Sequence, residues 1–161
     1  MSHVDPLTRR LVRSWAAREP EREPVFSALA TPLASCRVAL LSTAGLALRD
    51  DRPFDQAGEE RNPWWGDPSH RVIPRGTPGS ALQCYHLHID PRPIEEDLNC
   101  ALPLERLEEL AAAGVIGEVA DAHYSIMGYL LDTAELERET VPQIAESMRA
   151  EGVEVALLVP V

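Results

Sequence analysis

The chain has 161 residues, of which 45% are hydrophobic and 25% are charged, and these values fit one compact globular domain. The 26 acidic residues outnumber the 15 basic ones, and the formal net charge of -11 repels phosphate backbones and anionic lipid head groups. We therefore expect no nucleic-acid partner and no membrane partner. Three irregularly spaced cysteines, without a secretory signal or a membrane-spanning stretch, favour reduced thiols and a cytoplasmic location.

The first quarter of the chain predicts helices followed by a strand. Apolar residues recur at helical intervals over 6–18, which predicts an amphipathic helix. A second, shorter helical stretch is predicted over 25–33. The compact apolar run 37–45 (RVALLSTAG) predicts the first strand of an α/β unit, because it leads into a turn that contains glycine.

The middle of the chain predicts a long loop and then a second strand. Residues 47–80 are rich in proline, glycine and charge, and we expect a loop there with one short strand at 70–73. Residues 81–90 (ALQCYHLHID) predict a strand whose alternation places four polar side chains on one face. These are Cys84, His86, His88 and Asp90.

The last third of the chain predicts two helices and a terminal strand. Leu104, Leu107 and Leu110 mark a helix that Gly114 ends. A last helix is predicted over 135–150, followed by the apolar strand within 151–161. The recurring order of strand, helix and strand predicts a single α/β domain, a three-layer sandwich with a mainly parallel sheet.

Several polar segments allow more than one interpretation. The face formed by residues 84, 86, 88 and 90 has ligand types that suit zinc, but residues two apart on a strand seldom surround a metal alone. A partly solvated face is the structural alternative, and proton transfer by His88 and Asp90 is the catalytic one. Asp97 or Asn99 could cap a helix. Residues 123–129 (HYSIMGY) could line the edge of the sheet or pack in the core.

Four segments carry a resemblance to a known family. They are GDPSHRVIP at 66–74, HLHID at 86–90, the run from 95 to 129 and the final VEVALLVPV. In order and spacing they resemble the glycine/sarcosine/betaine reductase component B and D-proline reductase family. The resemblance covers 37–161 as the α/β domain, and it leaves 1–36 as an N-terminal helical extension that matches nothing in the family.

The resemblance implies an oxidoreductase-family subunit that cleaves a carbon–nitrogen bond reductively with a disulfide/dithiol couple. It further implies a small amine or amino-acid-like substrate, a thioredoxin-like or dithiol electron donor, and possible partner subunits. The site residues that it implies are His88, Asp90 and His123 beside the reactive atom, with no metal ligand among them. For substrate binding it implies Arg71, Asp97, Asn99, Tyr124 and Ser125, with Arg71 as a candidate for a carboxylate.

The family's reactive selenocysteine or cysteine would directly follow Val161, so the sequence as printed is catalytically incomplete and contains no cofactor. One hypothesis is that a UGA codon for selenocysteine was interpreted as a stop. An alternative is a non-enzymatic binding or regulatory paralogue, and a less favoured one is a metal-dependent hydrolase built on His86, His88 and Asp90. The sequence selects neither a substrate nor an oligomeric state.

Overall fold

The computed structural model describes residues 6–17, 28–58, 62 and 65–161. Its regular helices are α1 (Pro6–Ala16), α3 (Arg92–Glu96), α4 (Leu104–Ala112) and α5 (Val141–Ala150), the last preceded by a π-helical turn, Leu136–Thr140. Short 3-10 turns occupy Leu33–Ser35, Gly79–Ala81 and Leu98–Cys100. The strands are β1 (Arg37–Ser42), β2 (Leu46–Leu48), β3 (His70–Pro74), β4 (Leu82–Cys84), β5 (Glu118–Val119), β6 (Ala122–Ile126) and β7 (Val155–Val159).

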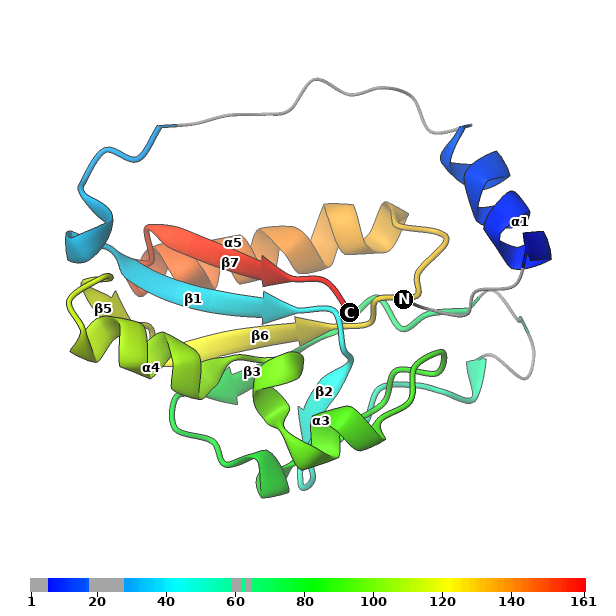
Figure 1. Ribbon diagram of the computed structural model, residues 1–161, viewed down its shortest axis with the longest axis horizontal. Helices are drawn as coiled ribbons and strands as arrows, with labels where there is room; N and C mark the ends of the chain where they lie inside the picture. Colours follow the sequence, from blue (N-terminus) through cyan, green and yellow to red (C-terminus); the bar gives the residue numbers. More distant parts are fainter. Residues whose placement is uncertain (1–5, 18–27, 59–61, 63–64) are drawn as a thin grey trace.

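The main sheet is built around β1, which pairs in parallel with β7 along one side and with β5 and β6 along the other (Figure 1). The register places Val38 opposite Val155 and Ser42 opposite Val159. At the far edge, β3 runs antiparallel to β6. The prediction of an α/β protein with a mainly parallel sheet is therefore confirmed.

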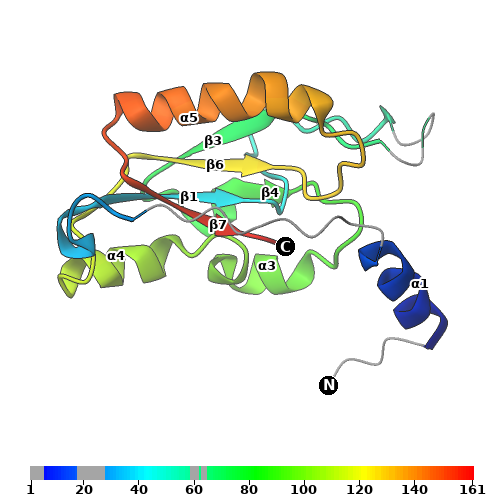
Figure 2. The same ribbon diagram turned by 90° about the horizontal axis from the view of Figure 1, so that it is seen from above.

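Helices cover both faces of this sheet, so the domain has three layers (Figure 2). Val38 and Leu40 of β1 pack in a core with Leu104 and Leu107 of α4. The alternate residue of β1, Ala39, packs in a second core with residues of β6 and α5, namely Tyr124, Ile126, Ile144 and Met148. The side-chain alternation of a strand thus divides the apolar residues of β1 between the two helical layers.

Two predicted elements are wrong in part. The predicted strand over 81–90 ends at Cys84, because β2 offers only three residues for pairing, and residues 87–89 form a turn. The predicted placement of Cys84, His86, His88 and Asp90 on one strand face is therefore wrong as well. Of the helix predicted over 25–33, residues 25–27 lie outside the described part, and residues 28–32 are not helical.

The other predicted elements are confirmed within a few residues. The helix within 6–18, the helix that begins at Leu104 and the last helix are all present. The strands predicted over 37–45, over 70–73 and within 151–161 are observed as Arg37–Ser42, His70–Pro74 and Val155–Val159. Gly114 follows α4 with a φ of 70°, a left-handed conformation that glycine adopts without strain. None of the helices in the described ranges is long and apolar enough to cross a membrane.

Candidate functional site

The carboxyl ends of β1, β6 and β7 meet at one edge of the sheet because the three strands run parallel. The residues that follow these strands are joined by backbone contacts. The Thr43 N–H donates to the Val159 carbonyl at 3.1 Å, and the Gly45 N–H donates to the Ile126 carbonyl at 2.9 Å. Gly45 has a φ of 61°, which lets the chain turn sharply here.

The loop that follows β4 reaches the same edge. The Tyr85 N–H donates to the Gly45 carbonyl at 2.8 Å and so attaches this loop to the end of β1. The next residue, His86, is half-buried, and its Nδ1 accepts a hydrogen bond from the backbone N–H of His88 at 3.1 Å. Burial, followed by the nearby His88, lowers the pKa of His86 below the usual histidine value. The ring is therefore neutral near pH 7, and its proton lies on Nε2.

Gly128 lies where these loops approach each other closely. A Cβ atom added to Gly128 would lie 2.8 Å from the Thr43 carbonyl oxygen, 2.9 Å from His86 Nε2 and 3.1 Å from Thr43 Oγ1. Because a side chain at this position would collide with backbone, glycine is required for the close approach. His86 Nε2 and Thr43 Oγ1 thus both lie close to the Gly128 backbone.

The end of β7 is held at this position by Thr43. The backbone N–H of Val161 donates to Thr43 Oγ1 at 2.8 Å. On the other side, the rings of His88 and Tyr129 lie 4.0 Å apart between centroids. We call these residues the carboxyl-edge cluster, which consists of Thr43, His86, His88, Gly128 and Tyr129.

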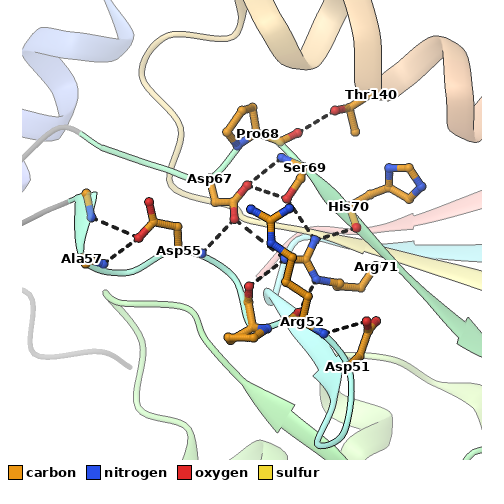
Figure 3. A network of polar contacts seen from close by, with 12 residues as sticks. Asp51, Arg52, Asp55, Ala57, Asp67, Pro68, Ser69, His70, Arg71 and Thr140 are labelled. Carbon is orange, nitrogen blue, oxygen red and sulfur yellow. Dashed lines mark hydrogen bonds and ion pairs between the residues drawn. The ribbon is translucent and has the colours of Figure 1, made fainter.

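A buried polar network centred on Arg71 adjoins this edge at the start of β3 (Figure 3). The guanidinium group donates to the Arg52 and Pro53 carbonyls, to Ser69 Oγ and to the His70 carbonyl at 2.6 to 2.9 Å. It also lies 3.8 Å from the Asp67 carboxylate, and both side chains are less than a tenth exposed. Arg71 therefore holds residues 52–53 and 67–69 against the sheet. Its predicted binding of a substrate carboxylate stays a prediction.

Asp67 is the anion of this network. Burial alone would raise its pKa, but hydrogen bonds from Ser69 and from the Asp55 N–H, together with the Arg71 charge, lower the pKa below its usual value. The carboxylate consequently stays ionised inside the loop. Beside it, Thr140 donates to the Pro68 carbonyl at 2.7 Å and joins the loop to the start of α5.

Asp97 and Asn99, the predicted substrate-binding pair, organise the turn before α4. Asp97 accepts hydrogen bonds from the Asn99 backbone and side chain, each at 2.9 Å. Asn99 Oδ1 in turn accepts from the Glu105 N–H in the first turn of α4. Both residues also border a cavity of about 460 Å³ between β2, β4 and the 3-10 turn at Leu98–Cys100. The structure thus shows their capping role, while substrate binding stays a prediction.

His123 lies in the core, apart from the carboxyl-edge cluster. It is fully buried near the start of β6, and its Nδ1 accepts the N–H of Leu40 at 3.0 Å. On this side β1 pairs first with β5 and then with β6, and the Leu40 N–H lies between the two pairings. The His123 side chain supplies the hydrogen-bond acceptor for this N–H. Burial lowers the pKa of His123 to about 4, and the charge of Glu108 offsets this effect only in part.

The remaining predicted site residues are dispersed. Tyr124 is buried in the core beneath α5, and burial raises the pKa of its hydroxyl group. Ser125 is buried, and its Oγ accepts the N–H of Leu46 at 2.8 Å. Asp90 is exposed and paired with Arg92 at 2.6 Å. Of the predicted residues, His88 alone belongs to the carboxyl-edge cluster.

A metal centre was one interpretation of residues 84–90. Within the described ranges, no group of three or more His, Cys, Asp or Glu side chains is placed to hold a metal ion. Cys84 Sγ lies 3.2 Å from the Ala44 carbonyl, and burial raises the pKa of this thiol. Cys84 is therefore a protonated, partly buried thiol.

Comparison with known proteins assigns the chain to a family. Residues 20–160 match the family model of glycine/sarcosine/betaine reductase selenoprotein B (GRDB). The chain belongs to this family. A relative, D-proline reductase subunit gamma from Acetoanaerobium sticklandii, is 31% identical over 135 residues. The matched region is 84% of this chain and 52% of the relative, so the chain spans about half the length of this relative. No solved structure matches the chain.

Four residues of the carboxyl-edge cluster were not selected as reductase-site residues from the sequence. They are Thr43, His86, Gly128 and Tyr129. A weak signal for His86 was present in the sequence, because this residue lies in the HLHID segment and histidine is a common metal ligand. Thr43 lies in the small-residue turn STAG, which gave no specific signal, and its position emerges only from the pairing of β1 with β7.

Proposed function

We propose that the chain forms part of a cytoplasmic reductase that cleaves a carbon–nitrogen bond in a small amine or amino-acid-like substrate. Family membership supports the reaction class, and the relative is named as a reductase subunit. The overall reaction balances simply. The carbon–nitrogen bond breaks, carbon and nitrogen each gain one hydrogen, and a dithiol loses two hydrogens to become a disulfide.

The observation that carries this proposal is the position of the end of β7. The Val161 backbone is held against Thr43 Oγ1, and Thr43 itself lies close to Gly128. A selenocysteine or cysteine directly after Val161 would enter the site at the carboxyl edge of a parallel sheet. Active sites of α/β proteins commonly lie at such edges, and a chalcogen with a low pKa is a strong nucleophile near neutral pH.

Partner subunits and an external electron donor belong to the same proposal. The matched relative is about twice the length of the region that this chain covers, and it is itself named as a subunit. We infer that further polypeptide completes the site and that a thioredoxin-like protein or another dithiol regenerates the reduced chalcogen. The net charge of -11 favours a donor surface with basic side chains.

The nucleotide sequence after codon 161 tests this function. We expect an in-frame UGA or cysteine codon followed by further coding sequence. Mass spectrometry of protein made from the whole reading frame, in a host that inserts selenocysteine, should then show the chalcogen directly after Val161. An ordinary stop codon followed by noncoding sequence would contradict the proposal and favour a binding or regulatory paralogue.

A further inference from the structure

Strand β7 carries exposed leucines on both of its faces. Leu157 and Leu158 are 45% and 64% exposed, respectively. The register with β1 places Leu157 opposite Leu40 and Leu158 opposite Leu41. Leu40 lies in the core beneath α4, whereas Leu41 packs against the core beneath α5. The two leucines therefore extend both apolar faces of the sheet beyond β1, where the described residues leave them open to solvent.

The outer edge of β7 also presents backbone hydrogen-bonding groups. Among the described residues, β7 pairs with β1 alone (Figure 1). In a parallel pair, the N–H and C=O groups of one residue point toward the neighbouring strand and those of the next residue point away. Because the Val159 carbonyl accepts the Thr43 N–H, the N–H and C=O groups of Leu158 point away from β1. These groups meet the pairing requirements of a further strand.

The composition of β7 is that of an interior strand. Its sequence, VALLV, contains no charged residue and no proline. Soluble proteins usually protect an open sheet edge with charged residues, proline or a bulge. The strands of parallel sheets, in contrast, are continuous apolar runs that helices cover on both faces. An edge position therefore leaves β7 with apolar surface in water, which is unfavourable.

The family relative contains polypeptide that can cover this edge. The match covers 52% of D-proline reductase subunit gamma, so nearly half of that relative lies outside the match. Since β7 runs toward the carboxyl edge, a continuing chain must cross back over one face of the sheet before it adds a parallel strand. Right-handed crossovers that proceed in one direction across a sheet all use the same face. The preceding connection, from β6 to β7, runs through α5, on the face of Leu158.

We propose that β7 is an interior strand of the complete protein. The polypeptide after Val161 forms a helix that packs beside α5 on Leu158, and then a strand that pairs in parallel with the outer edge of β7. This inference rests on the proposed function, which places further coding sequence after codon 161. The added strand ends at the same edge as β1, β6 and β7, so the residues that follow it approach the carboxyl-edge cluster from the side of β7.

Matched leucine-to-lysine variants test the proposal in protein made from the whole reading frame. We expect Leu158→Lys to lower the thermal midpoint by about 8 °C, because the charge enters an apolar layer. Leu131→Lys is the control, since Leu131 is 60% exposed and lies in the loop before the π-helical turn. Its midpoint should stay within about 1 °C of the wild type. Equal midpoints in the two variants would overturn the proposal.

Hydrogen exchange of the unsubstituted whole protein gives a second readout, which decides the question if Leu158→Lys unfolds. The Leu158 amide hydrogen should exchange at least about 100-fold more slowly than in an unstructured peptide, because it bonds to the added strand. Dilution should not change this protection. Rapid exchange at Leu158 would overturn the proposal. Protection that is lost as an oligomer dissociates would also overturn it, since a second copy would then cover the edge.

The proposed function can fail separately from this inference. Suppose that codon 161 is followed by coding sequence without selenocysteine or cysteine at the next position, and that the Leu158 amide is protected. That result would remove the proposed function and support the added strand. A chalcogen directly after Val161, together with rapid exchange at Leu158, would overturn the added strand and leave the proposed function standing.

Discussion

Replacing Arg71 with methionine should lower the free energy of unfolding by about 3–5 kcal/mol, because the change leaves a buried carboxylate without its cation and two carbonyls without their donors. Arg71 and Asp67 are 6% and 7% exposed, so water cannot replace the lost contacts. The carbonyls of Arg52 and Pro53 lose their donors at the same time. Urea unfolding at pH 7 measures the effect.

The matched control is Arg92→Met. Arg92 also contacts an aspartate, Asp90, at 2.6 Å, but both side chains are exposed, and we expect the urea midpoint to stay within error of the wild type. The double variant Arg71→Met with Asp67→Asn should be less destabilised than the sum of the single changes. An Arg71→Met protein of unchanged stability would contradict the structural role and favour substrate binding as the main role of Arg71.

Between pH 6.5 and about pH 4, the free energy of unfolding should fall as the solution becomes more acidic, with a contribution from His123 of up to about 1.4 kcal/mol per pH unit. The sign follows from the depressed pKa of the buried ring. Across this window the unfolded chain binds a proton on His123 that the folded protein excludes. The stabilisation is therefore present above pH 6.5 and is lost as the pH falls.

Urea unfolding at several pH values in this window measures the slope, and His123→Asn is the informative variant. Asparagine can still accept the Leu40 N–H, but it does not titrate. The variant should be less stable at pH 7, because it leaves space in the core, and its stability should depend less on pH. If the free energy of unfolding of the variant changes with pH as steeply as that of the wild type, other groups, such as the carboxylates, control the loss of stability in acid.

The main sheet was predictable because its strands are short apolar runs bounded by turns, and these patterns depend on local sequence. The second strand was not, since ALQCYHLHID alternates over ten residues but pairs only at Leu82–Cys84. Strand length depends on the partner, and β2 offers three residues. The apolar and polar residues still alternate beyond Cys84, but the chain forms a turn there. His86 and His88 therefore do not share a strand face.

The sequence predicted where the candidate site would lie in the fold, but it did not predict most of the residues that form it. The rule that α/β sites lie at the carboxyl edge located it, and the HLHID segment pointed to His88. The sequence could not show that His123 would enter the gap between β5 and β6, since that depends on an acceptor for Leu40. Nor could it show that Arg71 would be enclosed by carbonyls from a loop about 20 residues earlier.

The central claim is that this fold delivers a reactive chalcogen to the carboxyl-edge cluster. The most direct measurement is anomalous diffraction at the selenium edge from crystals of the protein made from its whole reading frame. The account predicts one selenium position, in the residue directly after Val161, at the edge where the carboxyl ends of β1, β6 and β7 meet. A selenium atom far from this edge of the sheet, or no selenium atom in the protein, would contradict it.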